Sequence, residues 1–170
     1  MNILVTGGVG YIGSHTVRAL QQAGYTPIIV DNLSRGHVES IPEGVKFYNM
    51  DIADPKLVGI MKEHNILGVM HFAAHSQVGE SMQNPAIYYE NNVVGSYHLI
   101  ESARTAGIKH FVFSSTAAVY GEPKVVPIRE DAQLQPTNVY GRTKLMIEEM
   151  MSDYSSISVS YTHLRAHETP

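Results

Sequence analysis

The feature that most constrains the fold is the opening stretch, an apolar run that stops at a cluster of glycines. The run Ile-Leu-Val at residues 3–5 is followed by Gly7, Gly10 and Gly13, and a helical pattern then continues to Ala23. Strand, glycine turn and helix form the entry to a dinucleotide-binding unit, because the N–H groups and partial positive charge of the helix start suit a pyrophosphate. The glycines are spaced G-x-x-G-x-x-G, which differs from the more familiar pattern, so the cluster alone is equally compatible with an ordinary strand-to-helix turn.

Short apolar runs alternate with helical patterns along the rest of the chain. The expected strands are 2–6, 27–31, 45–49, 68–72 and 110–114, and the expected helices are 11–23, 55–64, 85–105 and 140–153. Continuously apolar strands that alternate with helices favour a parallel sheet covered on both faces. With right-handed crossovers this predicts a doubly wound α/β fold of the Rossmann type, here as one domain over residues 1–154.

Composition and charge narrow the classes of function. The chain has 170 residues, no cysteine and a formal net charge of -4. The lack of cysteine excludes a disulfide framework and a thiolate metal site, and the lack of a basic stripe disfavours nucleic acid as a partner. No apolar run is long enough for a membrane span and no secretory leader is visible, so a cytoplasmic location is expected. His163 and His167 are spaced i,i+4, but they lack the acidic base of the metalloprotease pattern, and no metal site is predicted.

Acidic residues follow the second and third expected strands. Asp31 lies one helix and one strand after Gly13. In this fold an acid at about that place hydrogen-bonds the adenine ribose hydroxyls and repels a 2′-phosphate, which favours NAD over NADP. A solvated turn acid is an equally good interpretation of Asp31 by itself, and the nearby Arg35 could weaken the preference. Asp51 and Ile52 end the third strand, where they could meet the adenine.

Three further groups stand where a cofactor or substrate would lie. Ala73 and Ala74 leave space beside a bound cofactor, although plain close packing explains them too. Asn91 and Asn92 fall inside the long helix, where asparagine is unfavourable, so at least one is expected to have a specific hydrogen-bonding role unless both lie at the surface. The hydroxyls of residues 114–116 end the fifth strand, where doubly wound sheets bind ligands, but turn or cap roles are commoner for such residues.

Tyr140 and Lys144 are four positions apart at the start of the last expected helix, and so lie on one face of it. A free tyrosine has a pKa near ~10 and is a poor base at neutral pH. A lysine ammonium one turn away, together with a cationic nicotinamide, would stabilise the phenolate. The spacing alone is most often a surface pair, and it gains meaning here from the hydroxyl cluster and the glycine turn in the same chain.

Together these residues resemble the extended short-chain dehydrogenase/reductase family, and within it the UDP-hexose 4-epimerases. The resemblance runs from Met1 to about Asp153. It is carried by the segments VTGGVGYIGSH (5–15), VDNLS (30–34), VMHFAA (69–74), VGES (78–81), YYENNV (88–93), FSSTAAVYG (113–121) and YGRTKLM (140–146).

The resemblance implies a bound NAD and a UDP-sugar substrate, UDP-glucose or UDP-galactose, interconverted through a 4-keto intermediate. It makes Tyr140 the catalytic base, Thr116 its hydroxyl partner, and Lys144 the group that binds the nicotinamide ribose and tunes Tyr140. At Ser76 some family members carry a lysine that reaches the cofactor. The residues implied to bind NAD are Gly7, Gly10, Tyr11, Ile12, Gly13, Asp31, Asn32, Leu33, Ser34, Asp51, Ile52, Phe72, Ala73, Ala74, Ser76, Asn91, Ser114, Tyr140 and Lys144.

The match to the family stops near the carboxyl end. In the family, another buried strand and a substrate-binding domain follow the Tyr-Lys helix. Here residues 157–161 alternate apolar and polar, unlike a strand buried on both faces, and the stretch after Val159 does not resemble the family. Residues 155–170 are therefore interpreted as a tail outside the family, with disorder as one expectation. A homodimer through the helices 85–105 and 140–153 is also expected from the resemblance.

Two alternatives to an epimerase stay open. One is a catalytically incompetent NAD-binding module that dimerises, because the segment that would recognise the uridine diphosphate is missing. The other is a different nucleotide-sugar enzyme, such as a 4,6-dehydratase. A dehydratase needs an acidic pair after the strand-end hydroxyl, and this chain has Ala117 and Ala118 there.

Overall fold

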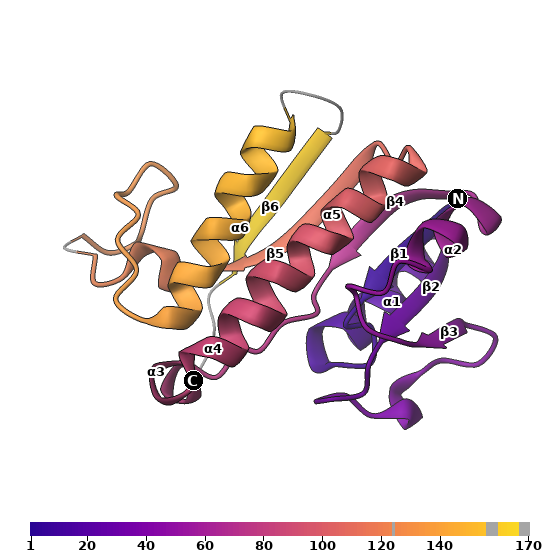
Figure 1. Ribbon diagram of the computed structural model, residues 1–170, viewed down its shortest axis with the longest axis horizontal. Coiled ribbons are helices and arrows are strands. Elements are labelled where there is room, and N and C mark those ends of the chain that lie inside the picture. Colours follow the sequence, from indigo (N-terminus) through magenta and orange to yellow (C-terminus); the bar gives the residue numbers. More distant parts are fainter. Residues whose placement is uncertain (124, 156–159, 167–170) are drawn as a thin grey trace.

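A computed structural model describes residues 1–123, 125–155 and 160–166, the last of these by their backbone alone (Figure 1). Within these residues the strands form one parallel sheet in the order β3-β2-β1-β4-β5-β6. This is the strand order of the dinucleotide-binding doubly wound fold, and the predicted fold class is confirmed. The strands are β1 (Asn2–Thr6), β2 (Thr26–Asp31), β3 (Lys46–Asn49), β4 (Ile66–His71), β5 (His110–Thr116) and β6 (Ser160–Ala166).

The helices connect the strands, as the alternation of patterns predicted. They are α1 (Tyr11–Gln22), α2 (Leu57–Glu63), α3 (Val78–Gln83), α4 (Pro85–Tyr88), α5 (Gly95–Ala106) and α6 (Val139–Ser155), with short turns η1 (Val38–Ser40) and η3 (Ala117–Tyr120). The long helix expected over 85–105 is present, but it is divided: a π-helical turn, η2 (Tyr89–Val94), joins α4 to α5. Within the described part of the chain, no helix is both long enough and apolar enough to cross a bilayer.

The core lies on both faces of the sheet. Adjacent residues of β1 point in opposite directions, so Leu4 packs with Leu99 of α5 and Ile147 of α6, whereas Val5 packs with Val17 of α1. Figure 1 shows α5 and α6 side by side along the sheet, and the two helices are in contact. With α5 and α6 on one face and α1 on the other, the carboxyl ends of the strands are held at one edge, where ligands of this fold bind.

The end of the chain differs from the sequence-based expectation. Residues 160–166 form β6, which pairs in parallel with β5. The expectation of disorder was therefore wrong for these residues. β6 lies at the edge of the sheet and pairs with β5 alone, and an edge strand does not require the continuous apolar run of a central one. The spaced pair His163 and His167, at which no metal site was predicted, lies outside the residues whose side chains the structure describes.

His71 ends β4 inside the sheet and is 1% exposed. Its Nδ1 lies 2.7 Å from the Thr6 hydroxyl and its Nε2 lies 2.9 Å from the Ser96 hydroxyl. The ring stacks on Phe113 with the centroids 5.5 Å apart. Burial, and then the charge of Lys144, lower the pKa of His71 to about 3, so the folded protein keeps this imidazole neutral.

The state of His71 predicts a pH-dependent stability. The unfolded chain takes up this proton near pH 6.5 and the folded chain only near pH 3, so the unfolded state binds more protons between these values. Stability should therefore fall as the pH drops from 6.5 toward 3, with His71 contributing up to about 1.4 kcal/mol per pH unit. Urea unfolding of the wild type and of His71→Gln at several pH values measures this contribution. Equal slopes in the two proteins would contradict it.

Candidate functional site

A groove lies at the carboxyl ends of β1, β2 and β4, with about 530 Å³ of empty space that is partly open solvent. Its lining includes the predicted cofactor residues Gly7, Gly10, Asp31, Asn32, Ser34, Asp51, Ile52, Phe72, Ala73, Ala74 and Asn91. Four additional residues complete it: Arg35, Gly36, Met50 and His75. Sequence reasoning named Arg35 only as a neighbour of Asp31 and missed the other three. The groove thus gathers segments that are far apart in the sequence, as the fold class predicted.

The remaining predicted residues do not line this groove, namely Tyr11, Ile12, Gly13, Leu33, Ser76, Ser114, Tyr140 and Lys144. The side chains of Tyr11 and Ile12 are 83% and 53% exposed. Gly10 begins α1 without a capping side chain, and the first turn closes when Ser14 N donates to Gly10 O at 2.9 Å. The N–H groups of residues 11–13 precede this bond, so they are available to a ligand at the start of α1.

The three glycines of the opening turn have different structural reasons. Gly7 has φ +70°, and a Cβ on it would lie 2.5 Å from Ala73 N, while a Cβ on Gly13 would lie 2.1 Å from Gly7 O. These two glycines are required by the packing of the turn itself. A Cβ on Gly10 meets only Gly7 O, at 3.3 Å. Gly10 therefore leaves open space in the groove, of the kind that a pyrophosphate needs.

Asp31 joins the end of β2 to the glycine turn. Its Oδ2 accepts from Val9 N at 3.3 Å and its Oδ1 accepts from Leu33 N at 2.9 Å. The carboxylate also lines the groove, so Asp31 organises a turn and is available to a ligand there; at 8% exposed it is not the solvated turn acid of the alternative interpretation. Next to it, Asn32 Nδ2 donates to Asp51 Oδ2 at 3.0 Å, which links the ends of β2 and β3.

Tyr140 and Lys144 lie on the buried face of α6, each 3% exposed. The Lys144 Nζ donates to Ser114 O at 2.8 Å and lies 5.9 Å from the centre of the Tyr140 ring. It also lies 4.6 Å from the centre of the Phe113 ring, close enough for a cation–π interaction. The pair is therefore not the surface pair that its spacing alone suggests, and it stands at the carboxyl end of β5.

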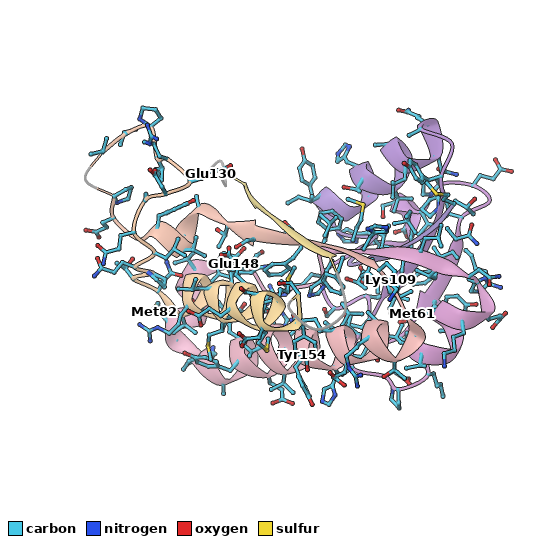
Figure 2. All side chains as sticks on the ribbon, turned by 90° about the horizontal axis from the view of Figure 1, so that it is seen from above. Met61, Met82, Lys109, Glu130, Glu148 and Tyr154 are labelled. Atoms are coloured by element: carbon cyan, nitrogen blue, oxygen red, sulfur yellow. The ribbon has the colours of Figure 1, made fainter. Side chains whose placement is uncertain are left out.

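The side chains of two residues at the end of β5 make structural hydrogen bonds. Thr116 Oγ1 accepts from Ala118 N at 3.1 Å and caps η3, and Ser115 Oγ donates to the Glu148 carboxylate. Figure 2 shows Glu148 on the side of α6 that faces the sheet and Tyr154 toward α5. Cap formation, the commoner role of such hydroxyls, thus fixes the Thr116 oxygen at the start of η3, a turn that packs against α6.

Asn92 connects the groove to the Tyr-Lys helix. It is fully buried in η2, and its Oδ1 accepts from His75 N at 2.8 Å. Its Nδ2 donates to His75 O at 3.0 Å and to Thr143 Oγ1 at 3.2 Å. The Thr143 hydroxyl in turn donates to Tyr140 O at 2.7 Å. The expectation that one asparagine has a specific role is confirmed for Asn92, while Asn91 lines the groove.

Comparisons with known proteins agree with this arrangement. The model of the NAD dependent epimerase/dehydratase family matches residues 3–168. A UDP-glucose 4-epimerase of Lactobacillus helveticus is 46% identical over 97% of this chain and 51% of its own length. The chain spans about half the length of the curated relatives it matches.

Solved structures are similar over the same part of the chain. The UDP-glucose 4-epimerase from Brucella ovis in complex with NAD has a TM-score of 0.94 and 43% identity, covering 96% of this chain and 51% of that one. The UDP-glucose 4-epimerase from Thermotoga maritima with UDP-glucose has a TM-score of 0.93 and 40% identity, covering 97% of this chain and 55% of that one.

The glycine geometry predicts that two alanine substitutions act differently. Gly10→Ala should fold with near-normal stability, because its Cβ needs only a small shift, but should weaken NAD binding by about tenfold or more. Gly13→Ala should destabilise the chain by roughly 1–3 kcal/mol, because its Cβ overlaps a carbonyl. Thermal melting and calorimetric titration with NAD separate the two effects. Equal losses of stability in the two variants would refute this assignment.

Proposed function

The chain belongs to the NAD dependent epimerase/dehydratase family, and on that premise we propose that it binds NAD in the groove and interconverts UDP-glucose and UDP-galactose at C4. We propose that residues 1–154 form the core of its NAD-binding domain. The observation that carries the proposal is the buried Tyr140–Lys144 pair, placed at a strand end and tied to the groove wall through Asn92. A cytoplasmic location is also part of the proposal.

The groove fits a dinucleotide through three features of this chain. Gly10 leaves its space free of a side chain at the start of α1. The Asp31 carboxylate faces the same space and is an acceptor for ribose hydroxyls. Ala73 and Ala74 form a wall without bulky side chains. The open space, the carboxylate acceptor and the small wall residues together support NAD as the cofactor.

The chemistry divides between the cofactor and the chain. NAD, when bound, accepts and returns the hydride of the sugar C4. Tyr140 is proposed to take the proton of the C4 hydroxyl and to give it back after the keto sugar has presented its other face. Lys144 holds an ammonium on the same buried face of α6, where charges attract more strongly than in water. Thr116 is proposed to hydrogen-bond the reacting hydroxyl from the end of β5.

One observation favours a second candidate function, an NAD-binding module without turnover. The described groove is lined by the residues proposed to bind the cofactor, whereas Tyr140, Lys144 and Thr116 lie outside its lining. The dehydratase alternative has less support, because Ala117 and Ala118 offer no acidic pair beside Thr116.

Turnover of UDP-galactose distinguishes these candidates. We expect the purified chain to produce UDP-glucose, and Tyr140→Phe to lower the rate by at least about a hundredfold while NAD stays bound. Chromatography measures the sugar nucleotides and the NAD released on denaturation. Tyr97→Phe, an exposed tyrosine of α5, is the matched control and should retain full activity. If the wild type binds NAD but converts no UDP-galactose, the NAD-binding module without turnover is the correct function. If Tyr140→Phe is fully active, Tyr140 is not the catalytic base.

A homodimer is also proposed, through the outer faces of α4, α5 and α6. Ile87, Tyr97 and Met146 are 41%, 43% and 38% exposed on these helices, which contact one another. Sedimentation equilibrium should give a dimer, and Tyr97→Glu should shift it toward monomer, because a buried unpaired charge is costly in an apolar interface. Val125→Glu, at an apolar residue that is 70% exposed in the loop between η3 and α6 and on none of these helices, should leave the dimer unchanged. A monomeric wild type would contradict the proposal.

A further inference from the structure

An ion pair crosses from the segment after β2 to α3, at the rim of the groove. Arg35 Nη2 donates to both carboxylate oxygens of Glu80, at 2.9 Å and 2.7 Å. Arg35 is part of the groove lining together with Asp31. The side chains of Arg35 and Glu80 are 44% and 27% exposed. Partly exposed ion pairs of this kind contribute little to stability. Stability therefore does not explain why Glu80 binds the Arg35 guanidinium at the groove rim.

The carboxylate of Glu80 is held from a second side. The hydroxyl of Tyr88, a residue that is fully buried, donates to Glu80 Oε2 at 2.8 Å and lies 2.7 Å from Gln77 O. The hydrogen bonds from Tyr88 and then from Arg35 lower the pKa of Glu80 below its usual value. Glu80 is therefore an anchored, charged acceptor that keeps the Arg35 guanidinium at α3.

The position of Arg35 matters for the choice of cofactor. In this fold the adenine ribose lies at the acid that ends the second strand, here Asp31, and a nearby arginine is the usual group that accepts a 2′-phosphate. Guanidinium groups bind phosphate strongly through charge-assisted hydrogen bonds. An unengaged Arg35 would thus attract NADP and oppose the selection by Asp31.

We propose that Glu80 is a specificity-determining residue: by occupying the Arg35 guanidinium, it withholds the phosphate-binding group of the groove and lets Asp31 select NAD over NADP. The inference rests on the proposed NAD site. Asp31, Asp51 and Glu80 contribute three negative charges against the one positive charge of Arg35, so a 2′-phosphate meets a net negative wall. Without the charge of Glu80, that wall loses one negative charge and carries an available guanidinium.

Dissociation constants of NAD and NADP, measured by calorimetry on the whole chain, test the proposal. Glu80→Gln keeps an acceptor for Tyr88 but loses the charge, and we expect NADP to bind about tenfold more tightly relative to NAD. Adding Arg35→Gln to that variant should abolish the gain, while Arg35→Gln alone should change the ratio little. Glu80→Asp, which keeps the charge on a shorter side chain, should give an intermediate gain and serves as the second variant if Glu80→Gln folds poorly.

Glu90→Gln is the matched control, because Glu90 is an exposed carboxylate beside Asn91 and not the partner of Arg35. It removes one negative charge near the groove and should leave the NADP-to-NAD ratio unchanged. An unchanged ratio in both Glu80 variants overturns the proposal, as does an equal gain in Glu90→Gln, which would show a general charge effect. If the wild type binds NAD in such a case, the proposed function stands. If it binds neither dinucleotide, both proposals fail.

Discussion

The structure depends on one buried amide. Asn92 has no exposed surface, and its side chain bonds both backbone groups of His75 and the hydroxyl of Thr143. A buried amide without partners costs about 1–3 kcal/mol, so the segment after β4 and the start of α6 must meet at this point. The π turn that carries Asn92 is a feature often found at functional sites, where its wider winding redirects a side chain.

The strand ends carry negative charge on one side of the sheet and a buried ammonium on the other. On the side of β1 and β2, Asp31 lines the groove together with Arg35, whose guanidinium pairs with Glu80. On the side of β5, the Lys144 ammonium lies over the face of Phe113 and against the Ser114 carbonyl, and nearby His71 is held neutral. A neutral imidazole between the strands avoids a second buried cation beside Lys144. The arrangement places acceptors at the proposed ribose and the ammonium at the proposed site of proton transfer.

Much of the groove could be predicted from local signals. Gly10 and Asp31 follow apolar runs at positions that this fold reserves for ligand contacts, and both line the groove. His75 could not be predicted, because it belongs to no motif and enters the site through its backbone bonds to Asn92. The pairing of Glu80 with Arg35 was equally invisible, since no local pattern relates two side chains 45 positions apart. β6 was missed because an edge strand does not need the apolar run by which central strands are identified.

The sequence by itself determined the order of strands and helices, and hence the doubly wound sheet, because periodicity and glycine turns are local properties of the chain. It also selected Tyr140 and Lys144, because helical spacing places residues four apart on one face and the same chain carries the glycine turn and the strand-end hydroxyls. Only the tertiary structure decided which glycines serve packing and which leaves space for a ligand, since a Cβ clash depends on what lies opposite. It alone decided that the Tyr-Lys pair is buried and that Asn92 joins it to the groove, because both require segments distant in sequence to pack together.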